Sequence, residues 1–142
     1  MRILALIAVV VSAGILFITP KASAHGKDPR GVTTDAQMKK LHSMMPMFSI
    51  ASAELETALE KGDSAAALVQ SEKIKYATPD LKKSKPHKNI KQRKKFVEIA
   101  TSFDEAITST VDLIKKDDIA GAKTAFKKVE EVCAACHAKF HD

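Results

Sequence analysis

The segment Cys133-Ala134-Ala135-Cys136-His137, near the end of the 142-residue chain, places two thiols and an imidazole close together. Residues three positions apart share one face of a helix, so both thiols can reach the same bound group. A C-x-x-C-H pattern is typical of covalent haem attachment, in which the thiols add to the two vinyl groups and the histidine binds the iron. We therefore predict one haem c per chain, attached through Cys133 and Cys136, with His137 as the proximal iron ligand.

Other sites use the same residue types. A thioredoxin-type C-x-x-C pair belongs to a βαβ unit, and this chain has no alternating or β-branched run typical of strands. Zinc is a closer alternative, because the two cysteines, His137 and His141 are suitable ligands. All four lie on one expected helix, however, which would have to break to surround the ion. A disulfide between the two cysteines is the remaining alternative.

Residues 1–24 have the features of a secretory signal peptide: a basic residue, an apolar stretch over 3–18 and the A-x-A cleavage site Ala22-Ser23-Ala24. The apolar stretch, at about 16 residues, is shorter than the roughly 20 needed to span a bilayer, so we expect no stable membrane anchor. Cleavage after Ala24 would leave residues 25–142 as a single domain. Because haem attachment in bacteria occurs outside the cytoplasmic membrane, the two motifs together indicate the periplasm.

The elements that must position the motif are amphipathic helices, because apolar residues recur every three or four positions. Thr34 and Gln37 form a capping box that begins the first helix. Lys61-Gly62-Asp63 ends this helix with a glycine and offers Asp63 as the next cap. The expected core-facing residues of the first helix are Met38, Leu41, Met45, Phe48, Ser52, Leu55 and Leu59.

Two prolines are expected to disturb the helices, because proline lacks the N–H that bonds to the carbonyl four residues earlier. Pro46 predicts a kink or local break in the first helix. Thr78-Pro79 is expected to end the second helix, which begins at about Ser64 and reaches Ala77. The residues expected to face inward on this helix are Ala66, Val69, Ile74 and Ala77.

A lysine-rich connector follows, and the third helix is expected to begin at about Lys88 or Gln92. Asp117-Asp118 caps a fourth helix that carries the haem motif on its core-facing side. Four helices with short connections and one longer connection predict an all-α fold, an antiparallel four-helix bundle with the covalently bound haem inside.

An exported four-helix chain with C-x-x-C-H close to the end of its last helix resembles the cytochrome c prime family. The resemblance extends over the mature chain. On the last helix it rests on Gly121-Ala122, Phe126, Val129, the motif and Phe140. It implies a homodimer through the first two helices.

Gln37-Met38-Lys39 is similar to the family segment in which a methionine or leucine faces the iron from the distal side. Two residues depart from the family pattern. Thr34 stands where an arginine often occurs, and His141 stands where a basic residue often follows the terminal aromatic. Both departures concern the polar surroundings of the haem.

Helix geometry also favours Met38 as the distal ligand. In an up-down-up-down bundle the start of the first helix lies beside the end of the fourth, so Met38 and His137 are each about 6 Å from the same end of the bundle. Met45 would lie about 10 Å deeper. His42, one turn beyond Met38, is the alternative ligand, which would lower the reduction potential relative to methionine. Met44 and Met47 are interpreted as packing residues.

The run from Lys82 to Lys95 contains eight basic residues and no acidic one: Lys82, Lys83, Lys85, Lys88, Lys91, Arg93, Lys94 and Lys95. Such a patch can steer an acidic redox partner protein, and it can equally be a solvated face. Nucleic acid is not expected as a partner, because no aromatic residue interleaves the lysines as a stacking surface would require. His87 lies within this run.

The resemblance implies two functions, separated by the distal ligand. A methionine on the iron indicates an electron carrier, whereas an open sixth position indicates a five-coordinate protein that binds nitric oxide or carbon monoxide. We expect a periplasmic monohaem electron carrier, with gas binding as the alternative. We expect no enzymatic activity, because no pairing of a nucleophile with a base is evident.

Overall fold

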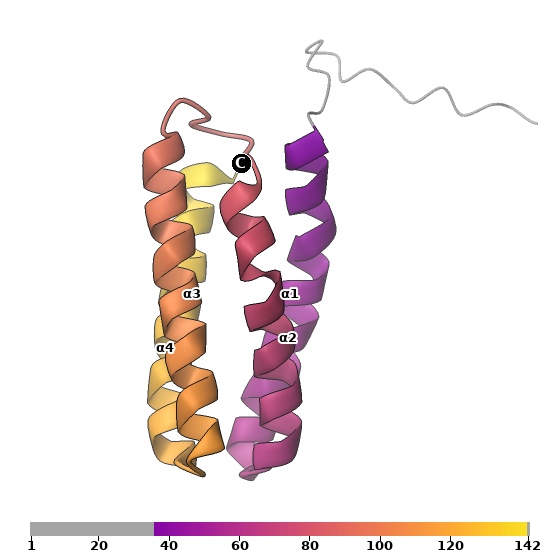
Figure 1. The fold of residues 1–142 in the computed structure, drawn as a ribbon, viewed down its shortest axis with the longest axis vertical. Coiled ribbons are helices and arrows are strands. Elements are labelled where there is room, and N and C mark those ends of the chain that lie inside the picture. Colours follow the sequence, from indigo (N-terminus) through magenta and orange to yellow (C-terminus); the bar gives the residue numbers. More distant parts are fainter. Residues whose placement is uncertain (1–35, 142) are drawn as a thin grey trace, which may run out of the picture. The chain divides into compact units, whose positions relative to one another are not determined.

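Residues 36–141, which a computed structural model describes, form four helices, each antiparallel to the one before it in the chain (Figure 1). Thr34 and the expected signal peptide at 1–24 lie outside the described residues. The helices are α1 (Ala36–Lys61), α2 (Ser64–Lys83), α3 (Arg93–Lys115) and α4 (Ile119–Phe140). The predicted all-α four-helix bundle is therefore confirmed. Within the described range, none of the helices has the length and apolar character that a membrane crossing requires.

Local residues determine where most of these helices begin and end. Gly62 has a φ of 71°, a left-handed conformation that glycine adopts without steric cost, and it separates α1 from α2. The Asp63 carboxylate accepts a hydrogen bond of 2.9 Å from the Ala66 N–H at the start of α2. The Asp118 carboxylate accepts one of 2.8 Å from the Gly121 N–H at the start of α4. Both predicted caps are thus confirmed.

Neither proline breaks its helix, contrary to the expectation that Thr78-Pro79 ends α2. Pro79 removes the N–H that would bond to the carbonyl of Lys75. The Thr78 hydroxyl lies 2.9 Å from this carbonyl and 2.6 Å from the Asp104 carboxylate of α3, so its proton is shared between two acceptors. Because the carbonyl keeps a polar partner, α2 continues for one more turn.

Asp104 anchors this part of α2 to α3. Its carboxylate accepts a 2.6 Å hydrogen bond from Lys82 as well as the contact from Thr78. Partial burial raises the pKa of Asp104, but the hydrogen bonds from Lys82 and Thr78 outweigh burial and hold the pKa below its usual value. The carboxylate is therefore ionised at neutral pH, and the anchor is charged.

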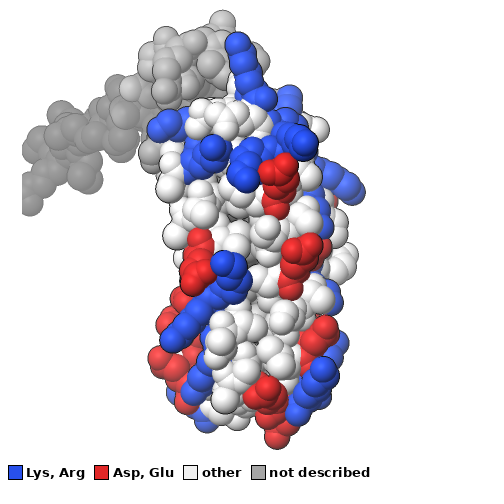
Figure 2. Space-filling model, turned by 90° about the vertical axis from the view of Figure 1, so that its left-hand side faces the viewer, with Lys and Arg blue, Asp and Glu red and all other residues white. Residues whose placement is uncertain are grey.

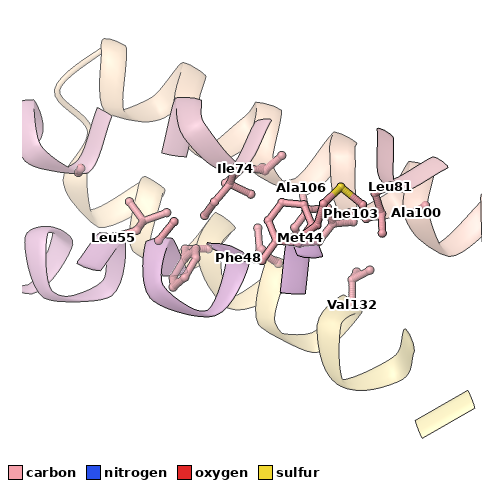
Figure 3. Close-up of a cluster of buried hydrophobic side chains, with 14 of the residues drawn as sticks. Met44, Phe48, Leu55, Ile74, Leu81, Ala100, Phe103, Ala106 and Val132 are labelled. Atoms are coloured by element: carbon pink, nitrogen blue, oxygen red, sulfur yellow. The ribbon is translucent and has the colours of Figure 1, made fainter. Parts of the chain in front are cut away.

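The buried face of α2 agrees with the expected one at Ile74, which is fully buried, and differs from it at Val69, which is 62% exposed. The predicted Ala66 and Ala77 are partly buried and pack against the core. The other buried side chains of α2 are Ala67, Ser71, Thr78 and Leu81. Small residues allow α2 to approach its neighbours closely, and they carry a weaker hydrophobic signal than valine does. On α1, the predicted Leu41, Phe48, Leu55 and Leu59 are buried, and they belong to the hydrophobic cluster of which Figure 3 shows a part.

The four helices do not contact one another equally. The pairs α1·α2, α2·α3 and α3·α4 pack extensively, whereas α1 and α4 contact each other only sparsely. The segment 84–92, between α2 and α3, crosses the end of the bundle at which α1 begins and α4 ends (Figure 1). The sparse contact leaves room for a bound group between α1 and α4.

Candidate cofactor cavity

A cavity of about 740 Å³ lies between α1 and α4. This volume falls within the roughly 300–1,000 Å³ typical of cofactor and small-molecule sites. Its lining is mostly apolar, with one acidic residue, Glu130, and no lysine or arginine. The remaining lining residues are Leu41, His42, Met45, Pro46, Phe48, Ser49, Ser52, Leu81, His87, Phe96, Ile99, Ala100, Phe103, Val129, Val132, Cys133, Cys136, His137, Phe140 and His141.

Helix α4 forms one wall of the cavity, and this wall contains all three residues of the predicted haem motif. Cys133 and Cys136 are half-buried and are not joined by a disulfide, and His137 follows them on the same helix. Burial raises the pKa of the Cys133 thiol to about 11, with smaller contributions from Cys136 and Glu130, and burial also raises the pKa of Cys136. The thiols are therefore protonated at neutral pH and face an apolar space.

Neither zinc nor a disulfide is supported by this geometry. Helix α4 continues without a break through Phe140, so the two cysteines, His137 and His141 do not close around one ion. Among residues 36–141, no group of three or more His, Cys, Asp or Glu side chains is arranged to hold a metal ion. The donor set instead fits a large, mostly apolar group that is attached through two thiols and one imidazole.

The α1 wall contains His42 and Met45, but Met38 is not among the residues that line the cavity. Met38 is partly buried in the first turn of α1, at the same end of the bundle as His137, as the sequence predicted. Met45, which the sequence argument disfavoured, does line the cavity. Met44 is buried and Met47 packs against the core, so both are packing residues as predicted.

His87, in the connector, is the residue of the cavity that the sequence interpretation missed. Its ring stacks on that of His42, with centroids 4.1 Å apart, and their Nε2 atoms contact each other. The His87 ring also makes an edge contact with the ring of His141, with centroids 6.4 Å apart, and the centroids of the His141 and His137 rings are 5.7 Å apart. No local pattern indicates this arrangement, because His42 and His87 are 45 positions apart.

The connector is attached to both helices that flank the cavity. Lys85 donates its N–H to the Gln37 carbonyl of α1, and Lys88 donates its N–H to the Phe140 carbonyl of α4, each over 3.4 Å. The Asn89 side chain donates a 2.6 Å hydrogen bond to the carbonyl of Lys139. The connector, through which His87 reaches the cavity, is thus bonded to both α1 and α4.

Comparison with family models gives the description Cytochrome C', matched over residues 36–141. Neither the comparison with curated proteins nor that with solved structures returned a match. The matched residues include all four helices, the cavity and the C-x-x-C-H motif. Sequence, fold and cavity agree, and the chain belongs to the cytochrome c' family of c-type cytochromes with covalently bound haem c.

Proposed function

We propose that this protein is a periplasmic electron carrier with one haem per chain. The chain contains two cysteines and one C-x-x-C-H motif, which suffice for a single covalent attachment. Proteins of this family are typically periplasmic or extracellular, in agreement with the signal peptide expected at 1–24. When bound, the haem supplies an iron that alternates between the ferric and ferrous states.

The chain's own residues would hold this group in a mostly apolar surrounding. Cys133 and Cys136 would provide the thioether links, and His137 would provide the proximal imidazole. Aromatic side chains from three helices pack around the cavity, including Phe48 and Phe103, whose rings lie 5.4 Å apart in an edge-to-face contact. A largely apolar, closely packed surrounding limits solvent rearrangement when the iron changes its charge.

The proposal rests on one observation: side chains with atoms that can bind iron line the side of the cavity opposite α4. His42 and Met45 of α1 and His87 of the connector all line the cavity. Met38, the ligand that the resemblance implies, lies one turn before Leu41 and is not among the lining residues. A protein side chain in the sixth position favours electron transfer, because it leaves no open position for a gas.

The purified wild-type protein should be low-spin in both redox states and should not bind carbon monoxide readily. The reason is that a protein ligand must leave the iron before the gas can enter. Electronic absorption and electron paramagnetic resonance spectra, together with carbon monoxide titration of the reduced protein, test this. A high-spin, five-coordinate wild-type protein that binds carbon monoxide or nitric oxide rapidly would assign the chain to gas binding instead.

Basic side chains at the cavity end support docking of an acidic redox partner. Figure 2 shows lysine and arginine gathered at this end of the bundle, whereas both signs of charge mix along its length. Not all of the predicted patch is available for docking, because Lys82 pairs with Asp104 and Arg93 donates 2.5 Å hydrogen bonds to the carbonyls of Ser84 and Lys82. The exposed basic residues are Lys83, Lys85, Lys88, Lys91, Lys94 and Lys95, of which Lys95 also pairs with Glu98 over 3.2 Å.

Electron transfer to an acidic partner should slow as ionic strength rises, because salt screens the attraction between the two surfaces. Replacing Lys88 and Lys91 by glutamine should weaken this salt dependence. The same replacement at Lys123 and Lys127, which are exposed on α4, is the matched control. Stopped-flow rates with a small acidic redox protein, measured at several salt concentrations, test the proposal. If both double variants show the same salt dependence, the connector is not the docking site.

A further inference from the structure

The connector residue His87 carries an inference that rests on the proposed haem protein and goes beyond it. We propose that His87 supplies the distal ligand of the haem iron, in place of the methionine that the family resemblance implies. The iron would then be held between two imidazoles, those of His87 and His137. The argument rests on the position of His87 in the cavity, on the anchoring of the connector and on the chemistry of the His42–His87 pair.

His87 lies within the cavity that the haem motif lines. His87 is half-buried, and the ring of His141 makes edge contacts with the rings of both His87 and His137. His87 therefore borders the same continuous space as Cys133, Cys136 and His137. Met38, by contrast, does not line this space.

The backbone on both sides of His87 is fixed. Pro86, directly before it, is fully buried, and its ring restricts φ. After it, Lys88 and Asn89 bond to the carbonyls of Phe140 and Lys139, in the last turn of α4. Asn89 has a φ of 56°, a left-handed conformation that asparagine tolerates better than most residues. His87 is thus attached to the same helix that carries the cysteines and His137.

Arg93 fixes the beginning of the connector. Its guanidinium donates to the carbonyls of Ser84 and Lys82 and lies 5.4 Å from the centre of the Phe96 ring. Ser84 is itself buried, and its hydroxyl donates a 2.7 Å hydrogen bond to the Leu81 carbonyl. A ligand needs such support, because small displacements of the surrounding groups weaken the bond to the metal.

The other candidates are less well fixed relative to α4. His42 and Met45 are on α1, which has few contacts with α4. Their separation from the haem motif is therefore set indirectly, through α2 and α3. The hydrogen bonds of Lys88 and Asn89, in contrast, join the segment around His87 to α4 directly.

His42 and His87 bring two imidazole rings together at one side of the cavity, stacked with their centroids 4.1 Å apart. An imidazole nitrogen is a group that binds haem iron. Once His87 binds the metal, His42 remains as its neighbour on the same side of the cavity. Imidazole in place of thioether lowers the reduction potential.

Replacement of His87 by glycine should convert the oxidised protein from low-spin to high-spin, and added imidazole should restore the low-spin spectrum. The ring supplied from solution would occupy the space that the deleted side chain leaves. Matched controls are His42→Ala, His141→Ala, Met38→Ala and Met45→Ala, all of which should stay low-spin. Electron paramagnetic resonance and absorption spectra of the covalently loaded proteins are the readouts.

A second variant, His87→Met, distinguishes loss of the iron ligand from loss of folding. It retains a ligand and should remain low-spin while gaining the near-infrared sulfur-to-iron band that the wild type lacks. Its reduction potential should be higher than that of the wild type. Far-UV circular dichroism of both variants confirms that the helices are kept.

The outcomes separate the two proposals. A low-spin wild type that stays low-spin in His87→Gly overturns the assignment of His87 but keeps the electron carrier, and the control that turns high-spin then identifies the ligand. A wild type that shows the near-infrared sulfur band assigns the sixth position to methionine. A wild type that is already high-spin overturns both proposals.

Discussion

Replacing both Cys133 and Cys136 by alanine should abolish covalent haem. Each thiol forms one of the two bonds to the porphyrin, and the described part of the chain offers no further cysteine. Purified wild-type protein should show the mass of the mature chain plus one haem and a haemochrome spectrum in alkaline pyridine. The double variant should show neither, even when it is expressed with a complete cytochrome maturation system.

The double variant should also be less stable than the wild type. Without haem, the cavity of about 740 Å³ is lined by apolar groups that have no partner atoms to contact. The matched control is Ala135→Ser, because Ala135 is exposed between the two cysteines and its replacement preserves the C-x-x-C-H pattern. Haem that survives denaturing electrophoresis of the double variant would contradict the assignment. A wild type that contains stoichiometric zinc and no haem would do so as well.

The sequence predicted those features that depend on neighbouring residues. Gly62, Asp63 and Asp118 act within one turn of the helix ends that they determine, so their spacing alone locates the ends. The C-x-x-C-H motif is equally local. Its position on a core-facing helix surface follows from periodicity, and the structure places it in the cavity wall.

Predictions failed where a distant or weakly hydrophobic residue determines the structure. Pro79 is accommodated by a hydroxyl that is shared with Asp104, which is 26 positions from Thr78, and sequence spacing does not reveal such a partner. On α2, Ile74 is buried as predicted, but Val69 was wrongly expected to face inward, because it is strongly hydrophobic yet exposed while small and polar side chains are buried. Helix periodicity identifies a buried face through its strongly hydrophobic residues, so a helix that packs through small and polar side chains gives a weak signal.

The distal side of the cavity illustrates the same limit. The sequence placed Met38 and His137 at one end of the bundle, and the structure has them there. It could not place His87, because a connector has no periodicity and the position of this residue depends on bonds to α1 and α4. A histidine within a lysine run gave no local signal of a role in the cavity.

Replacing Phe96 by alanine should destabilise the protein more than any surface change, by roughly 3 to 5 kcal/mol. Phe96 is 1% exposed, lines the cavity and packs edge-to-face on Phe140 at 5.3 Å. Its truncation leaves a void and removes the ring over which Arg93 lies. The hydrogen bonds by which Arg93 holds the connector should therefore weaken as well. Urea unfolding of the haem-loaded protein, followed by far-UV circular dichroism, measures the loss.

The matched control for Phe96→Ala is Tyr76→Ala, which removes an aromatic ring that is 90% exposed on α2. Because this ring buries little surface, its loss should change the free energy of unfolding by no more than about 0.5 kcal/mol. If the two variants lose similar amounts, Phe96 is not part of a packed core, and the cavity wall would have to be flexible enough to close over the void. A large loss in Phe96→Ala alone, together with an altered haem spectrum, would show that this ring supports both the bundle and the connector. The spectral change would follow from Arg93, since the connector that carries His87 begins at the carbonyls to which Arg93 donates.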